Sequence, residues 1–268
     1  MSACPAKRAE GQRELYVIDA YPLTNNMQRV ILGGDELASL VVDGSIIGPH
    51  LKMLIPSAGG GCFAWPEFDA EKGRLVWPDN IERPTLRTYS LRHFDVNRQQ
   101  LTIDLVSHEG GVASSWAKNA KPGDKLGIWG PGGKISFNGQ WLVLVGDISA
   151  LPAISYSLEM LPDDAQGKAI IEVSSDSDCI PLKAPAGIEI IWLVQHQGQP
   201  SQLVEAVTSI DIPTNVSPLI WGGMECGLAK ALRRGIKQKL RLSRDRFYLI
   251  NYWRQGIPEG GFSHLDEE

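Results

Sequence analysis

The segment Arg87-Thr88-Tyr89-Ser90 carries side chains that can bind a flavin nucleotide. It lies in a predicted β-strand, where alternation puts Arg87 and Tyr89 on one face and Thr88 and Ser90 on the other. From these positions Arg87 could pair with a pyrophosphate, Tyr89 could pack on an isoalloxazine ring, and Ser90 could hydrogen-bond the edge of that ring. An ordinary strand with an arginine that extends its charge into solvent fits the same residues, and this segment alone leaves both interpretations open.

The stretch from Asp104 to Trp116, DLVSHEGGVASSW, combines small residues with the expected start of a helix. We expect a strand that ends at His108, a turn at the two glycines, and a short helix that begins at Ser114 and Ser115. Glycines let a backbone approach a phosphate closely, and a helix N-terminus offers unpaired N–H donors. A Gly-rich turn with a serine N-cap is an equally good interpretation.

The first half of the chain is typical of short antiparallel strands. Alternating or β-branched runs predict strands at Leu15–Asp19, Met27–Leu32, His50–Ile55, Leu101–Val106 and Lys125–Trp129. Helical patterns occur only at Asp35–Val42 and near Ser114–Asn119. These elements predict an antiparallel barrel, closed by a tight turn at Gly130–Lys134. The Gly- and Pro-rich piece Ala58–Glu82 is expected to be a surface loop or hairpin insertion.

The second half alternates strands and helices. Trp141–Gly146 is a nearly continuous apolar strand, as in a sheet covered on both faces. Further strands are expected at Ala169–Val173, Ile188–Val194, Leu219–Gly222 and Phe247–Asn251, and helices at Ser149–Leu161, Ser201–Val207 and Glu225–Leu240. This order predicts a parallel sheet that binds ligands beyond the carboxyl ends of its strands. The predicted fold class is therefore a β barrel plus α/β, with domains at 1–138 and 139–268.

Composition excludes several classes of protein. Hydrophobic residues make up 43% and charged residues 21%, which is typical of a packed globular chain, and the formal net charge of −5 argues against nucleic-acid or anionic-membrane binding. The four cysteines and five histidines are scattered without a C-x-x-C pair, so we expect no metal held by the protein. No apolar run reaches the length of a signal peptide or a membrane span, so a cytoplasmic location is expected. A monomer is expected.

Five segments appear in a recognisable order: RTYS, DLVSHEGGVASSWA, KPGDKLGIWGPGG, GDISALPAI and the terminal NYWRQG. Over about Tyr16 to Gly256 the chain resembles the siderophore-interacting protein family, the ferric-siderophore reductases that include vibriobactin-utilisation proteins. The resemblance implies a ferredoxin-reductase-like fold with an N-terminal FAD-binding barrel and a C-terminal nicotinamide-binding-type domain.

The resemblance also implies which residues bind FAD and the ferric chelate. The FAD contacts would lie along a strand, a turn and a helix start: Arg87, Thr88, Tyr89, Ser90, Asp104, Leu105, Val106, His108, Ser114, Ser115 and Trp116. The family uses a small basic cluster for an anionic ferric catecholate, and the best matches by position are Lys52, Lys134 and Arg254. Each of these cations could equally be a solvated surface residue, and His108 could be a turn histidine satisfied by the backbone.

Two segments would face the reductant in this family. The turn that follows Trp141–Gly146 contributes Asp147, Ser149 and Ala150, although Asp147 could simply cap the next helix. Tyr252 and Trp253 would reach the isoalloxazine ring and control nicotinamide access, or be ordinary buried aromatics. The turn is not G-x-G-x-x-G, and the second strand of the sheet ends without Arg or Lys, so NADH and NADPH both stay open as donors.

Between Leu228 and Arg246 the chain has eight Lys or Arg and a single acid, Asp245. Several of the cations recur at helical spacing. This pattern fits a solvated helix face, or a docking surface for an acidic electron-transfer partner such as ferredoxin.

The resulting hypothesis is a flavin-dependent ferric-siderophore reductase. FAD would accept two electrons and pass them singly to two ferric siderophores, and reduction of Fe(III) to Fe(II) would release the iron in the cytoplasm. No protein acid or base is required. The alternatives are a ferredoxin or flavin reductase with a protein acceptor, and a non-catalytic cytoplasmic siderophore-binding protein.

Overall fold

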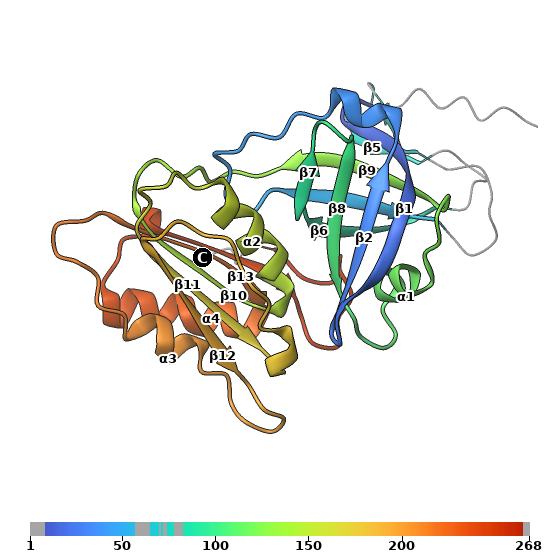
Figure 1. Ribbon diagram of the computed structural model, residues 1–268. Coiled ribbons are helices and arrows are strands. Elements are labelled where there is room, and N and C mark those ends of the chain that lie inside the picture. The colour runs from blue at the N-terminus through green and yellow to red at the C-terminus, as the bar shows by residue number, and fades with distance from the viewer. Residues whose placement is uncertain (1–8, 57–64, 70, 72–73, 78–82, 265–268) are drawn as a thin grey trace, which may run out of the picture. The chain divides into compact units, whose positions relative to one another are not determined.

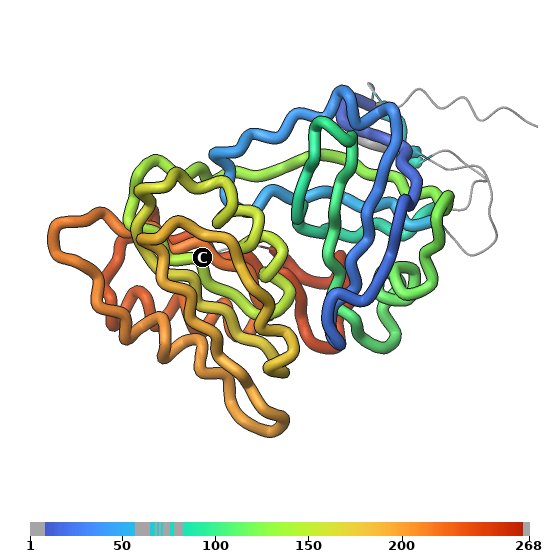
Figure 2. The backbone as a smooth tube through the Cα atoms, viewed as in Figure 1, coloured from blue at the N-terminus to red at the C-terminus, as the bar shows by residue number. Residues whose placement is uncertain are grey.

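The computed structural model describes residues 9–56, 65–69, 71, 74–77 and 83–264. They form two compact units, one from the residues up to 42 together with 49–132, the other from 43–48 together with those from 133 onward. The chain can be followed through each unit in Figures 1 and 2. The domain boundary between residues 138 and 139 stays a prediction.

The first unit is built on an antiparallel sheet. In the order of hydrogen-bonded neighbours its strands are β6 (Thr85–Ser90), β3 (His50–Ile55), β9 (Lys125–Gly132), β1 (Gln12–Thr24), β2 (Met27–Gly33), β8 (Gln100–Val106) and β7 (His93–Asp95). Every pairing is antiparallel. Although β6 and β8 are not hydrogen-bonded neighbours, they contact each other, so the sheet curves around its core (Figure 1). This confirms the antiparallel, barrel-like first half.

Alternation explains how these strands build a core. Leu101, Ile103 and Leu105 of β8 are fully buried, and Val30 and Leu32 of the neighbouring β2 are buried with them. Apolar residues at every second position place one face of a strand inside the unit.

Two expectations for the first unit need correction. The helix expected at Asp35–Val42 is only a 3-10 helix, Asp35–Ser39. β9 runs on to Gly132, which pairs with His50, so Gly130 and Gly132 belong to the strand rather than to a free turn. Most of Ala58–Glu82 lies outside the described residues; in the described part β4 (Glu67–Asp69) and β5 (Arg74–Val76) pair antiparallel, which agrees with the expected hairpin insertion.

The second unit is a five-stranded parallel sheet. Its strands, in order across the sheet, are β12 (Ile188–Val194), β11 (Gly167–Val173), β10 (Trp141–Asp147), β13 (Pro218–Glu225) and β14 (Phe247–Trp253). The helices are α2 (Leu151–Met160), α3 (Leu203–Thr208) and α4 (Cys226–Gly235), and α4 continues as a π-helical turn, Ile236–Leu240. The predicted parallel α/β half is confirmed, although a 3-10 turn, Ile148–Ala150, precedes α2.

Helices cover the sheet on both faces (Figure 1). Val143 and Val145 of β10 belong to one apolar cluster with Leu203 of α3 and Leu232 of α4. The alternate residues of β10 point to the other face, which α2 covers. Among the described residues, no helix has the length and apolarity that a membrane span requires.

The strand order places a topological switch point between β10 and β13. After β10 the chain adds β11 and β12 on one side, then returns to add β13 and β14 on the other side. In sheets of this kind, ligands bind beyond the carboxyl ends of the strands at such a point. The residues at these ends are Gly146 and Asp147 of β10, and Gly223 and Glu225 of β13.

Candidate functional site

The segment Arg87–Ser90 lies on β6, as expected. Thr88 stands directly opposite Lys52 in the antiparallel pairing of β3 and β6, and Lys52 Nζ donates a hydrogen bond to Thr88 Oγ1. Arg87 and Tyr89 alternate onto the other face, and both are half-buried. Arg87 Nη1 donates to the Leu86 carbonyl at 2.7 Å. Ser90 is buried at the end of the strand.

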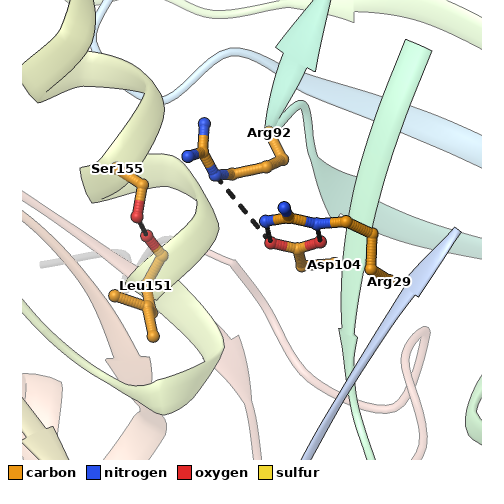
Figure 3. Close-up of polar contacts among 5 residues, drawn as sticks. All are labelled: Arg29, Arg92, Asp104, Leu151 and Ser155. Carbon is orange, nitrogen blue, oxygen red and sulfur yellow. Dashed lines mark hydrogen bonds and ion pairs between the residues drawn. The ribbon is translucent and has the colours of Figure 1, made fainter. Parts of the chain in front are cut away.

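Asp104 is held by arginines (Figure 3). The Nε and Nη2 of Arg29, its neighbour on β2, donate to Asp104 Oδ1 and Oδ2 at 2.7 and 2.8 Å, and Arg92 Nε lies 3.9 Å from Oδ2. Asp104 is only 3% exposed, and its hydrogen bond to Arg29 raises the pKa of that guanidinium. Leu105 is fully buried. Contacts of Asp104 and Leu105 with a cofactor would therefore come from their backbone.

The turn between β8 and α1 differs from the prediction in two respects. β8 ends at Val106, as the apolar run Leu101–Val106 predicted, and does not continue to His108; α1 (Val112–Asn119) begins at Val112 rather than Ser114. The buried Ser114 hydroxyl accepts from the His108 N–H and donates to the His108 carbonyl, both at 2.9 Å. Ser114 therefore fixes the turn and is not the N-cap.

The N-terminus of α1 has the features of an anion site. Its N-cap residue, Gly111, has no side chain that could cap the helix, so the first N–H groups of the helix stay available as hydrogen-bond donors. The exposed His108 ring packs over Gly111, where a Cβ would lie 2.1 Å from it. Its Nδ1 lies 3.1 Å from the Glu109 carbonyl oxygen. Ser115 is exposed and Trp116 half-buried on the same helix.

The three cations expected to bind the chelate occur in different units. Lys52 belongs to the first unit, while Lys134 and Arg254 belong to the second. Lys134 and Arg254 are exposed, just after β9 and β14 respectively, and within the described part of the chain neither has an ion-pair partner.

The carboxyl edge of the parallel sheet brings the reductant-side residues together. Asp147 caps the 3-10 turn, because its Oδ1 accepts from Ser149 N at 2.9 Å and from Ser149 Oγ at 2.5 Å. Its Oδ2 accepts from Glu225 N and from Trp253 Nε1, both at 2.9 Å. Burial raises the pKa of the Asp147 carboxyl, while the hydrogen bonds lower it. Ala150 is fully buried against Gly146.

The basic stretch after Leu228 is not one uniform surface. Arg233 is only 6% exposed, and its Nη2 donates to the Leu249 carbonyl and to Asn251 Oδ1 at 2.7 and 3.2 Å. Arg233 therefore anchors β14 and is not available for docking. Arg241 and Arg244 precede β14, so they lie at the amino edge of the sheet, opposite the switch point.

Sequence reasoning missed several residues of these sites. Arg29 and Arg92 act through pairing across strands, and only the alternation of β2 and β8 could have indicated the pair Arg29–Asp104. Glu225 was assigned to a helix, but it is the N-cap of α4, where its Oε2 accepts from the N–H groups of Gly227 and Leu228. Polar residues that start a helix often cap it in this way.

Comparisons with known families decide what this combination is. A family described as the siderophore-interacting FAD-binding domain matches residues 16–135, and one described as siderophore-interacting protein matches residues 139–256. The chain belongs to the siderophore-interacting protein family. Solved ferredoxin reductases at 15% to 18% identity share its fold, which is therefore ferredoxin-reductase-like.

Three members or relatives of the family are similar over most of their length. The ferric vibriobactin reductase ViuB of Vibrio cholerae is 32% identical over 92% of this chain and 92% of its own. The NADPH-dependent ferric-chelate reductase of Escherichia coli is 31% identical over 90% of this chain and 92% of its own. The crystal structure of the siderophore-interacting protein SipS from Aeromonas hydrophila, 34% identical, superposes with a TM-score of 0.77 over 93% of this chain and 94% of that one.

FAD is the cofactor of this family's first domain, and the residues present fit it. The uncapped start of α1 offers N–H donors to a pyrophosphate, and Arg87 adds a positive charge on β6. Tyr89 offers an aromatic face on the same strand.

Proposed function

We propose that this protein is an FAD-dependent ferric-siderophore reductase that reduces chelated Fe(III) to Fe(II) with electrons from NAD(P)H and so releases iron in the cytoplasm. The observation that carries the proposal is the pairing of an FAD-binding domain with a siderophore-interacting domain along one chain. The printed names of two relatives, a ferric vibriobactin reductase and an NADPH-dependent ferric-chelate reductase, support it.

The residues of the first unit bind and orient the cofactor in this proposal. Arg87 and the N-terminus of α1 hold the pyrophosphate, and His108 and Ser114 keep the backbone of that turn in place. Tyr89 packs on the isoalloxazine ring, and Thr88 and Ser90 are the further proposed cofactor contacts of β6. When bound, FAD supplies the redox chemistry, by accepting a hydride and releasing single electrons.

The substrate is an anionic ferric chelate, of which a catecholate siderophore is the proposed type. Lys52, Lys134 and Arg254 each offer a positive charge that would neutralise part of the negative charge of such a chelate. Siderophore oxygens are hard anionic ligands that bind Fe(III) better than Fe(II), so reduction loosens the complex. One NAD(P)H carries two electrons and therefore serves two ferric chelates, and no side chain has to transfer a proton to them.

Nicotinamide is the donor that the second unit supports better than ferredoxin. Its sheet presents a switch point with Asp147 and Glu225 at the carboxyl edge, which is the nucleotide-binding edge of such sheets. The exposed arginines before β14 lie at the opposite edge, and Arg233 is buried. An acidic protein such as ferredoxin, if it docked on those arginines, would contact the amino edge of the sheet and not the edge that carries the switch point.

The test is a steady-state assay of the flavin-loaded protein under anaerobic conditions with an Fe(II) trap. Ferric catecholate is offered together with NADPH, NADH or reduced ferredoxin as separate donors. The proposal predicts Fe(II) capture with at least one nicotinamide donor, and two Fe(II) for each NAD(P)H consumed. Tight chelate binding without Fe(II) release would point to a carrier. Preferential reduction of a protein acceptor would point to a ferredoxin or flavin reductase.

A further inference from the structure

The Asp147 carboxylate joins three strands at their carboxyl ends. From β10 it accepts the Glu225 N–H at the end of β13 and the indole N–H of Trp253 at the end of β14, both at 2.9 Å. Because β13 lies between β10 and β14, the indole that reaches Asp147 crosses the end of β13. The Trp253 ring therefore spans the topological switch point.

A β-bulge turns Trp253 into this position. The pairing of β13 with β14 shifts after Met224–Asn251, so that Glu225 pairs with Trp253 and Tyr252 is the extra residue. Bulges re-aim the side chains that follow them. The Tyr252 ring lies on Gly223, where a Cβ would approach it to 2.7 Å, and edge-to-face with Trp221. Tyr252 is thus packed on the sheet, whereas Trp253 is directed to Asp147.

Trp253 stays 42% exposed despite this bond. Its single polar atom is bonded to the carboxylate, so the surface that it shows to a ligand is the aromatic ring. A hydrogen bond to an ionised carboxylate is stronger than a neutral one and fixes the plane of the ring. Burial raises the pKa of that carboxyl, while the hydrogen bonds from Ser149, Trp253 and Glu225 lower it.

The charges beside Trp253 indicate which ring it receives. Asp147 and Glu225 are acids, and both lie at the switch point. They favour a ring that becomes positively charged on oxidation, as nicotinamide does, whereas the exposed Arg254 that follows Trp253 is one of the cations proposed for the anionic chelate. Tryptophan is the aromatic side chain that attracts a cationic ring most strongly.

We propose that Asp147 is a positioning residue that holds the indole of Trp253 as a platform for the nicotinamide ring of the electron donor. This rests on the proposed function and deepens its reductive half. The bond from Trp253 Nε1 to Asp147 Oδ2 is its structural basis.

The test compares Asp147→Asn, Trp253→Phe and the double variant as flavin-loaded proteins. Each single variant is expected to raise KM for NADPH or NADH about tenfold, the scale of one lost hydrogen bond to a charged group, and to leave KM for the ferric chelate unchanged. Because Asp147 acts through Trp253, the double variant is expected to be no worse than the more affected single variant. Asp245→Asn, an exposed acid at the opposite edge, serves as the matched control.

A rise in KM for the chelate in place of the donor, or effects that multiply in the double variant, would overturn the proposal. If Asp147→Asn does not fold, Trp253→Phe decides alone, and an unchanged donor KM contradicts the proposal. A second assay, in which dithionite replaces the nicotinamide donor, distinguishes a failure of the proposed reductase function from a failure of the proposed role of Asp147. Loss of ferric reduction by the dithionite-reduced wild type refutes the reductase, whereas intact reduction with an unchanged donor KM refutes only the role of Asp147.

Discussion

Lys52 and Thr88 face each other across the antiparallel pair of β3 and β6, and the ammonium of Lys52 donates a hydrogen bond to the Thr88 hydroxyl. One residue of this pair is a proposed chelate-binding cation, and the other is a proposed FAD contact. The pairing therefore puts a positive charge next to the strand that we expect to hold the flavin.

Replacement of Lys52 by Met should raise KM for an anionic ferric catecholate about fivefold to tenfold, because a nearby opposite charge is lost. KM for an uncharged ferric hydroxamate should hardly change. Lys121→Met, which removes an exposed lysine elsewhere in the first unit, is the control. Equal effects on both chelates would contradict an electrostatic role for Lys52. The measurement is steady-state Fe(II) capture.

Arg87→Met should weaken FAD binding about 10- to 100-fold, since a guanidinium–phosphate contact is lost while the apolar stem of the side chain is largely kept. The flavin content after purification and the dissociation constant from a fluorescence titration both measure this. Arg98→Met, at an exposed arginine beside Asp95, should bind FAD normally. Unchanged affinity in Arg87→Met would remove Arg87 from the cofactor site.

Asp104→Leu should lower the free energy of unfolding by about 3 kcal/mol, because it leaves the largely buried Arg29 without its carboxylate. The double variant Arg29→Met with Asp104→Leu should recover part of that loss, since the charge of Arg29 is then removed together with its carboxylate and only that of the more distant Arg92 remains beside the position. Denaturant unfolding measures both. Additive losses in the double variant would show that the pair is not coupled.

Arg233→Gln should cost about 2 kcal/mol of stability, because the carbonyl of Leu249 and the amide oxygen of Asn251 lose a charged donor in a buried place. The neighbouring Arg234→Gln changes the same charge on the exposed side of α4 and should be close to neutral. Similar melting temperatures for the two variants would contradict the structural role of Arg233.

The ionised Asp147 carboxylate should oppose stability, since burial raises its pKa in the folded state above the unfolded value. The folded protein then binds the proton more tightly, so this contribution is present at low pH and is lost as pH rises from the unfolded pKa through the folded one. As pH rises through this range, the stability of Asp147→Asn should therefore increase relative to that of the wild type. A difference that stays constant with pH would contradict the raised pKa.

The sequence predicts the bounds of an element well where local patterns determine them, and poorly where contacts between distant segments do. The bounds of β3 and β12 follow from apolar runs that end at polar or turn-forming residues, and both were predicted at His50–Ile55 and Ile188–Val194. The start of α1 was wrong because the Ser114 hydroxyl turns back to His108, which no serine pattern reveals.

Contacts between distant segments also account for the features that the sequence did not predict. Residues 43–48 pack with the second unit: Ile46 pairs with Ser136, and the Gly48 N–H donates to Ser157 Oγ at 3.0 Å. The family motifs named Asp147 and Trp253 separately. Their hydrogen bond depends on the bulge at Tyr252 and on the order of three strands, neither of which can be read from spacing.

The most direct test of the reductase is a single transfer from the reduced flavin-loaded protein to a ferric siderophore. The protein is reduced anaerobically with one equivalent of dithionite, then mixed with ferric catecholate and an Fe(II) trap, while flavin and Fe(II) absorbance are followed together. We predict that flavin absorbance returns as Fe(II) appears, with two Fe(II) for each FAD. Flavin that stays reduced, with no Fe(II) captured from a bound chelate, would contradict the account.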